Sequence, residues 1–247
     1  MLNKRPFCLS IAGFDPCAGA GILADIKTFE SFGVYGMGVI TSNTFQTDNE
    51  FVGLEWIELD SILKQQKMLM NKYHFESMKI GLVNNFDTLQ KVIQLAKKAN
   101  PSIHIVWDPI LASSSGYSFH SSSSMELQFV EENCTLITPN YEELKQLWDI
   151  EPALFACQFN SALLLKGGHR VSETGTDILF SNNASTEIPG VSFHGKSKHG
   201  TGCVLSAAIA AHLAKGENLK DSCTIAKTFV EKFILSNNSN LGFHEIK

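Results

Sequence analysis

The N-terminal part of the chain combines a strand, a glycine-rich loop, a helix and a second strand, and this unit restricts the possible folds more than any other stretch. An apolar run at residues 7–12 predicts a buried strand, and the loop 13–21 follows it. Apolar residues then recur at helical spacing over 22–29, and a second apolar run fills 34–41. This arrangement is typical of a parallel sheet, so an α/β fold is predicted.

The remaining sequence continues this alternation. Helices are predicted over residues 59–71, 86–99, 126–132, 204–215 and 219–236, and strands over 77–83, 103–107, 136–138, 162–165, 177–180 and 185–189. Residues 42–49 are predicted to form a polar loop, and the Ser- and Gly-rich tract 113–124 a mobile loop. Polar or glycine clusters follow five of the predicted strands, and in a parallel sheet such strand ends face one ligand crevice.

The length and charge of the chain limit its class. A chain of 247 residues with 44% hydrophobic residues is long enough for one large α/β domain, predicted to span residues 1–247. The net charge is −5, with acidic and basic residues mixed along the sequence. Because a broad nucleic-acid surface needs clustered Lys and Arg, no nucleic-acid partner is expected, although a nucleotide needs only a few local donors.

The cysteines and the N-terminus indicate the cellular compartment. The six cysteines contain no Cys-x-x-Cys pair, so their spacing indicates neither a zinc site nor a redox motif. Their wide scatter suits reduced thiols in a cytosol. The N-terminus lacks an apolar stretch long enough for a secretory signal, and no apolar run approaches a membrane span. We therefore expect a cytoplasmic protein with no membrane partner.

Residues 198–203 precede a strong helix former and are the first candidate site. Glycine lets the backbone N–H groups of Gly200, Thr201 and Gly202 approach a ligand, and the helix N-terminus adds partial positive charge. This combination predicts a hole for a phosphate or for charge developing on one. Cys203 at its mouth is expected to have a lowered pKa and to accept a proton. The alternative is an ordinary glycine loop in which Cys203 is a small buried residue.

The loop 13–21 and the segment after the second predicted strand are candidates for binding a substrate. The loop lacks the G-x-G-x-x-G register and no Walker lysine follows it, which argues against a dinucleotide site and a P-loop. Asp15 adds a polar group to the loop, whose glycines otherwise fit a tight turn that only permits close packing. The Gln46 carboxamide can donate to and accept from a heterocycle edge, although a solvated loop glutamine fits the same pattern.

Four polar residues follow later predicted strands. Asp108 ends a buried strand, where it faces the expected crevice. Asn140 and Glu143 lie three apart at a helix start, so both can face one point, and a carboxylate there can hold a hydrated Mg²⁺. The same spacing fits an N-cap and a capping box, and both interpretations can hold at once. Lys166 follows another buried strand and can bind a phosphate as a point charge.

The motifs that follow in order along the chain are AGFDPCAGAGILADIKTF, KIGLV, VWDPILASSSG, LITPNYEEL, LLLKGGH and KHGTGC. With these motifs the chain resembles the ribokinase-like superfamily and, within it, the hydroxymethylpyrimidine/phosphomethylpyrimidine kinases of thiamine biosynthesis, from Cys8 to about Phe233. The resemblance implies a three-layer α/β/α fold with a mostly parallel central sheet. It also implies transfer of the γ-phosphoryl group of MgATP to a primary alcohol on an aminopyrimidine, and then to the resulting monophosphate.

The resemblance implies roles for individual residues. The pyrimidine pocket would be lined by Gly13, Asp15, Ala20, Gln46 and Gly81, and Gln46 would read the amino edge of the ring. The metal and the ATP triphosphate would be placed by Asp108, Asn140 and Glu143, with Mg²⁺ held by Asp108 and Glu143. The nucleotide phosphates would be contacted by Lys166 and Thr201. The amides of residues 200–203 would stabilise the transferring group, and Cys203, where most ribokinase relatives have Asp, would be the candidate base.

The sequence departs from the family pattern in residues 43–48, which are more polar and bulkier, and in residues 149–160, where the family has another helix. A pyridoxal-type vitamin kinase shares much of the scaffold and is the alternative enzyme. A non-catalytic relative that binds a pyrimidine or a nucleotide is the third interpretation. A homodimer is compatible with the sequence, which leaves the oligomeric state open.

Overall fold

Strands and helices alternate along the residues that the computed structural model describes, which are 5–110, 124–148, 161–167, 175–191 and 198–245. The strands are β1 (Phe7–Phe14), β2 (Tyr35–Gln46), β3 (Phe51–Trp56), β4 (Ser77–Ile80), β5 (His104–Trp107), β6 (Leu136–Ile137), β7 (Ala162–Leu165), β8 (Asp177–Ser181) and β9 (Ala184–Ile188). The helices are α1 (Gly21–Ser31), α2 (Leu59–Lys72), α3 (Phe86–Ala99), α4 (Ser124–Asn133), α5 (Tyr141–Trp148), α7 (Thr201–Ala214) and α8 (Leu219–Leu235). The loop predicted at 113–124, up to residue 123, and the short stretch 149–160 lie outside the described residues.

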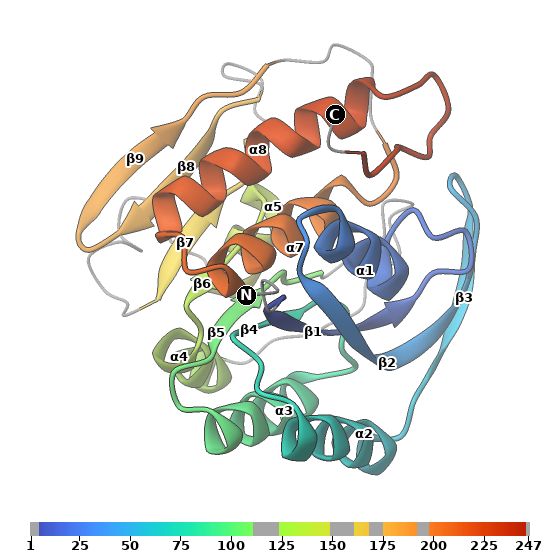
Figure 1. Ribbon diagram of the computed structural model, residues 1–247, viewed down its shortest axis with the longest axis vertical. Coiled ribbons are helices and arrows are strands. Elements are labelled where there is room, and N and C mark those ends of the chain that lie inside the picture. Colours follow the sequence, from blue (N-terminus) through green and yellow to red (C-terminus); the bar gives the residue numbers. More distant parts are fainter. Residues whose placement is uncertain (1–4, 111–123, 149–160, 168–174, 192–197, 246–247) are drawn as a thin grey trace.

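The nine strands form one sheet in the order β3-β2-β1-β4-β5-β6-β7-β8-β9 (Figure 1). Neighbouring strands from β2 to β7 pair in parallel. Antiparallel strands extend both edges, β3 beyond β2, and β8 and β9 beyond β7. The chain moves to one side of β1 to form β2 and returns to its other side to form β4. This reversal makes a switch point, and in open α/β sheets the ligand crevice lies outside the carboxyl ends of the strands at such a point.

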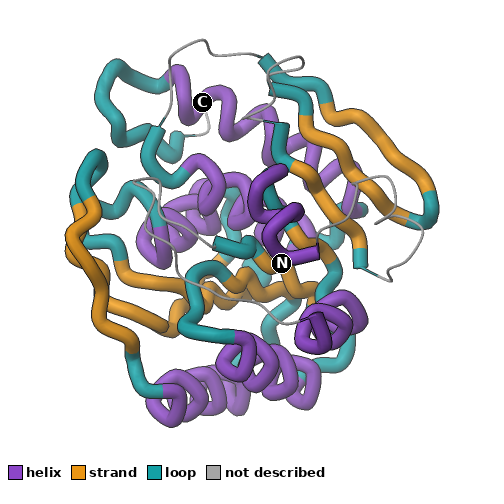
Figure 2. The backbone as a smooth tube through the Cα atoms, turned by 180° about the vertical axis from the view of Figure 1, so that it is seen from behind, coloured by secondary structure: helices purple, strands orange, loops and turns teal. Residues whose placement is uncertain are grey.

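Helices cover both faces of this sheet (Figure 2). One hydrophobic core joins the sheet to α2, α3, α4 and α5, and a second joins it to α1, α7 and α8. The strands supply both cores because successive side chains point to opposite faces: Leu9 and Ile11 enter the first core, and Cys8 enters the second. The predicted three-layer α/β/α arrangement with a mostly parallel sheet is confirmed.

Helix α7 lies at the centre of the second core. Every residue from Cys203 to Ala214 is buried, which is the pattern of a helix covered by protein on all sides. Five of these residues are alanines, and their small side chains allow close packing against the sheet, α1 and α8. The packing fixes the N-terminus of α7 at the carboxyl ends of the central strands.

The structure corrects the predicted secondary structure of residues 42–49. It is not a loop throughout, because β2 continues to Gln46 and pairs with β3. Ser42 and Thr44 are buried, and Thr44 Oγ1 donates to the carbonyl of Phe14 at 2.8 Å. The Thr44 side chain can therefore be buried in a strand here because the neighbouring strand supplies a hydrogen-bond acceptor. No helix among the described residues is both long enough and apolar enough to cross a membrane.

Candidate active site

The loop between β1 and α1 is built around the carboxylate of Asp15. Its Oδ1 accepts a hydrogen bond from Cys17 N at 3.0 Å, and its Oδ2 accepts from Gly19 N at 3.1 Å and Ala20 N at 2.8 Å. The Asp15 side chain is 1% exposed. Burial alone would raise the pKa of Asp15, but hydrogen bonds from His199, from Cys17 and from Ala20 lower it to about 2. Asp15 is therefore an ionised anchor for the loop.

His199 connects this loop to the start of α7. Its Nε2 hydrogen-bonds Asp15 Oδ2 at 3.0 Å, and its backbone N–H donates to Asn240 O at 2.9 Å. The next residue, Gly200, has a φ of +78°, and a Cβ there would lie 2.0 Å from the carbonyl oxygen of Gly19. Only glycine lets the two loops approach this closely. The sequence analysis assigned no role to His199; its signal is a histidine directly before the glycines of the candidate anion hole.

The N-terminus of α7 presents the amides that the sequence placed in the anion hole. Gly200 is the N-cap residue, and Thr201, Gly202 and Cys203 form the first turn. The first four N–H groups of an α-helix have no partner within the helix, so they are free of its own hydrogen-bond ladder. A Cβ on Gly202 would lie 3.6 Å from Lys166 Nζ and 3.7 Å from Asp108 Oδ2. The glycine turn therefore lies directly against these two charged groups.

The expected lowering of the Cys203 pKa is wrong. Burial raises the pKa of Cys203 to about 11, and this effect outweighs the opposing charge of Lys79 and a hydrogen bond from the Gly21 backbone. The residue is only 6% exposed. A helix N-terminus favours a thiolate, but removal of the sulfur from water penalises the charged form more strongly here. Cys203 is therefore a neutral thiol near pH 7.

Asp108, Glu143 and Lys166 form a charged cluster beside the first turn of α7. Lys166 Nζ lies 2.9 Å from Asp108 Oδ1 and 3.5 Å from Glu143 Oε2. The side chains of Asp108, Glu143 and Lys166 are 2%, 13% and 16% exposed. Asp108 follows β5, Glu143 lies in the first turn of α5 after β6, and Lys166 follows β7, so adjacent parallel strands bring the cluster together. The structure thus places Lys166 between the two predicted carboxylates, within ion-pair distance of each.

Two further side chains fix Asp108. Thr138 Oγ1 donates to Asp108 Oδ1 and Ser206 Oγ donates to Asp108 Oδ2, both at 3.2 Å. Burial opposes ionisation of Asp108, but Lys166 and Lys79 together lower its pKa below the ordinary value. Asp108 and Glu143 in turn raise the pKa of Lys166, against the effect of its burial. The cluster therefore contains an ionised Asp108 and a cationic Lys166.

Asn140 and Glu143 form the predicted capping box. Asn140 N–H donates to Glu143 Oε2 at 2.7 Å, and Glu143 N–H donates to Asn140 Oδ1 at 2.8 Å. Asn140 also forms an isolated parallel bridge with Lys166. The capping interpretation is therefore confirmed, and the same geometry points Glu143 toward Lys166. Burial raises the pKa of Glu143, while the Lys166 charge opposes this rise.

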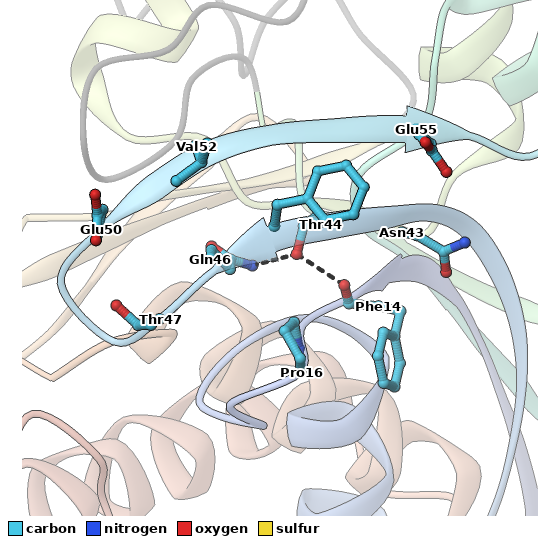
Figure 3. A pocket seen from close by; sticks show the side chains of 10 residues that line it. Phe14, Pro16, Asn43, Thr44, Gln46, Thr47, Glu50, Val52 and Glu55 are labelled. Carbon is cyan, nitrogen blue, oxygen red and sulfur yellow. Dashed lines mark hydrogen bonds between the residues drawn. The ribbon is translucent and has the colours of Figure 1, made fainter.

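A cavity of about 550 Å³ lies along the hairpin of β2 and β3, and Figure 3 shows its lining. Gln46 lines it, and its Nε2 donates to Thr44 Oγ1 at 2.8 Å. Thr44 Oγ1 in turn donates to Phe14 O, so this chain of hydrogen bonds orients the Gln46 carboxamide (Figure 3). Gln46 is thus a fixed group in a strand and not a solvated loop residue.

The other predicted pocket residues are not among those that line this cavity. A Cβ on Gly13 would lie 2.7 Å from Ser42 Oγ, and a Cβ on Gly81 would lie 2.8 Å from Lys79 Nζ. Ala20 is the N-cap residue of α1 and donates its N–H to Asp15. Gln46 thus lines the cavity together with Phe14 and Pro16, the two neighbours of Asp15, whereas the predicted pocket residues Gly13, Asp15, Ala20 and Gly81 do not line it.

A buried ion pair beneath these strand ends was missed by the sequence analysis. Lys79 Nζ lies 3.0 Å from Asp25 Oδ1 and 2.9 Å from Asp25 Oδ2, and both side chains are 0% exposed. Ser10 Oγ donates to Asp25 Oδ2 at 2.5 Å. The available signal was a lysine inside an otherwise apolar strand and an aspartate on the apolar face of the helix pattern at 22–29. Such residues are almost never fully buried unless paired.

Known proteins match this chain over nearly its whole length. A family model described as phosphomethylpyrimidine kinase matches residues 15–246. The chain belongs to the phosphomethylpyrimidine kinase family. A hydroxymethylpyrimidine/phosphomethylpyrimidine kinase of Aquifex aeolicus is 33% identical over 248 residues, which cover 95% of this chain and 96% of the relative.

Solved structures agree with this family membership. A phosphomethylpyrimidine kinase structure from Clostridium difficile matches with a TM-score of 0.77 and 29% identity, over 92% of this chain and 99% of that one. An ADP complex of Bacillus subtilis pyridoxal kinase matches with a TM-score of 0.81 and 25% identity, over 97% of this chain and 96% of that one. The ribokinase-like fold is thus shared between the phosphomethylpyrimidine kinase family and pyridoxal kinases.

Proposed function

We propose that this protein transfers the γ-phosphoryl group of ATP to hydroxymethylpyrimidine, to its monophosphate, or to both. The observation that carries the proposal is the Asp108–Glu143–Lys166 cluster against the first turn of α7, in a chain of the phosphomethylpyrimidine kinase family. Phosphoryl transfer needs positioning and charge stabilisation more than covalent chemistry. A lysine, two carboxylates and a helix N-terminus at one edge of the sheet supply both.

The charges of the cluster fit a magnesium–nucleotide complex. Asp108 and Glu143 offer the oxygen ligands that Mg²⁺ prefers, and the metal would neutralise charge on the transferring phosphoryl group. Lys166 would leave its carboxylate partners to contact the nucleotide phosphates. Thr201 and the amides of residues 200–203 would bind the transferring group, because fixed donors stabilise charge as it develops. Asn140 would hold Glu143 in place through the capping box.

The acceptor alcohol would lie beside Cys203. Because the thiol is neutral near pH 7, we propose that it orients the alcohol by hydrogen bonding and does not act as an obligatory base. A loose transition state supports this role, because the alcohol loses its proton late in the reaction and a strong base is not required. Gln46, held by Thr44, would read the amino edge of the aminopyrimidine, at the hairpin side of the loop anchored by Asp15.

A coupled ADP-release assay tests the proposal. Purified full-length protein is given MgATP with hydroxymethylpyrimidine or with its monophosphate, and Lys166→Met serves as the control for contaminating kinases. We expect turnover with at least one substrate and its loss in the control. Folded protein that turns over neither substrate contradicts the proposal; pyrimidine or nucleotide binding in a calorimeter without ATP consumption would instead identify a non-catalytic binder.

A pyridoxal-type kinase is the second candidate, and the similarity to the Bacillus subtilis pyridoxal kinase fold favours it. The two activities differ in the ring that the pocket must recognise. Turnover on pyridoxal that exceeds turnover on hydroxymethylpyrimidine at equal concentration would select this second candidate. The Gln46→Ala variant adds a check, because loss of the Gln46 carboxamide should reduce turnover of the aminopyrimidine more than turnover of pyridoxal.

A further inference from the structure

Asp15, Cys17 and His199 bring three atoms that can bind a metal to one point. Asp15 Oδ2, Cys17 Sγ and a ring nitrogen of His199 all lie within 4.8 Å of one another. Asp15 Oδ2 is 3.0 Å from His199 Nε2 and 3.3 Å from Cys17 Sγ. The Asp15 and His199 side chains are 1% and 7% exposed, and Cys17 is half-buried. This group shares no residue with the Asp108–Glu143–Lys166 cluster, although the family resemblance also places Asp15 at the pyrimidine pocket.

We propose that Asp15, Cys17 and His199 form a binding site for Zn²⁺ or a similar borderline-soft divalent cation, with a water molecule as the fourth ligand. Ligand atoms at 2.0–2.3 Å from a tetrahedral zinc ion lie roughly 3.3–3.6 Å apart. The two separations above fall within a few tenths of an ångström of this spacing. A thiolate and an imidazole beside one carboxylate select zinc over the hard ion Mg²⁺.

The protons balance in a simple way. The Asp15 carboxyl is already ionised, so it offers a lone pair at once. The Cys17 thiol releases its proton to solvent when sulfur binds the metal. In the metal-free protein Nε2 of His199 donates to Asp15, so a neutral ring must shift its proton to Nδ1, and an imidazolium must release its Nε2 proton, before Nε2 can bind the metal. The metal therefore replaces the two contacts that Cys17 Sγ and His199 Nε2 make to the same carboxylate oxygen.

The surrounding backbone already holds the ligands in place. The N–H groups of Gly19 and Ala20 stay directed at Asp15 Oδ2, and the N–H of Cys17 stays directed at Oδ1. His199 is held through its backbone bond to Asn240. Hydrogen bonds of this kind orient metal ligands and raise the affinity of a site. Metal binding thus needs the loss of one or two protons, while the backbone hydrogen bonds to Asp15 and His199 can stay in place.

A bound ion would fasten the loop before α1 to the residue before Gly200. These two segments lead into the helix starts that carry Ala20 and the predicted anion hole. We therefore expect the ion to inhibit phosphoryl transfer by locking both segments. This last expectation rests on the proposed function, whereas metal binding itself does not.

Titration of reduced, metal-free, full-length protein with Co²⁺ and Cd²⁺ in excess Mg²⁺ tests the site. We expect one equivalent to bind with a thiolate-to-metal charge-transfer absorption band. Cys17→Ser should abolish the band, and His199→Gln should weaken binding by about 10-fold or more. Cys203→Ala is the matched thiol control and should keep the band, with melting temperatures confirming that each variant is folded.

Absence of a charge-transfer band in the native protein, or a band that survives in Cys17→Ser, would overturn the proposal. A second arm measures whether Zn²⁺ slows ADP release by the native protein and spares Cys17→Ser, which we expect to retain its metal-free rate. Because absorption requires no turnover, a protein without kinase activity would still report on the metal site.

Discussion

Replacement of Lys79 by methionine should strongly destabilise the protein. The variant keeps most of the side-chain volume but leaves the Asp25 carboxylate, 0% exposed, with Ser10 as its remaining side-chain donor. Removal of one partner from a buried ion pair costs about 3–5 kcal/mol, because the other charge stays buried without compensation. For a chain of this size, each kcal/mol shifts the melting temperature by about 2–4 °C. The expected loss is therefore roughly 6–20 °C.

The loss of stability in Lys79→Met should also depend on pH. Burial raises the pKa of Asp25 even with Lys79 present. Without the lysine, folding favours the neutral carboxyl, so the folded-state pKa lies above the unfolded value near 4. Stability linked to this group is then fully present below the unfolded pKa and falls as the pH rises through the folded one. Urea denaturation should show a smaller deficit at pH 5 than at pH 8.

Two variants make this experiment decisive. Lys91→Met removes one partner of an exposed ion pair, whose side chains are 45% and 58% exposed, and should change stability by about 0.5 kcal/mol or less. The double variant Lys79→Met with Asp25→Leu removes both charges and should recover most of the loss. If Lys79→Met is no less stable than Lys91→Met, the buried pair does not hold the strand ends together, and the reasoning fails.

Four further outcomes follow from the site. Lys166→Met should lower kcat by about 10²–10³-fold while the protein stays folded, as measured by ADP release; an unchanged kcat would remove Lys166 from the phosphate site. Cys203→Ser should keep kcat within about 10-fold, because the buried thiol is neutral and the loose transition state asks little of a base. Gln46→Ala should raise the KM for the aminopyrimidine without changing the KM for ATP, and equal effects on both would contradict its assigned role. Asp15 has a folded-state pKa of about 2, below its unfolded value, so its ionisation contributes roughly 2–3 kcal/mol of stability above pH 4, which is lost as the pH falls toward 2. In urea denaturation, Asp15→Asn should therefore be less stable than the native protein at pH 7. The difference in stability between the two proteins should disappear in acid.

The sequence predicted most elements because their patterns are local. The amphipathic segment 86–99 matches α3, and the apolar run 162–165 matches β7. The miss at 42–49 has a physical cause: Thr44 satisfies its hydroxyl on Phe14, which is distant in sequence, so a polar segment continues a strand. Strand β3 was also missed, and it pairs with this extension of β2.

The sequence by itself determined the α/β architecture through the order of its strands and motifs. It also determined that Asp108, Glu143 and Lys166 lie close together, because parallel strands place their carboxyl ends at one edge of the sheet. Tertiary structure decided the properties of these groups. The pKa of Cys203 depends on how completely α7 is covered, and that of Asp15 on amide and imidazole donors delivered by two loops. Desolvation and hydrogen bonding arise from packing between segments far apart in the chain, so no local pattern of residues encodes them.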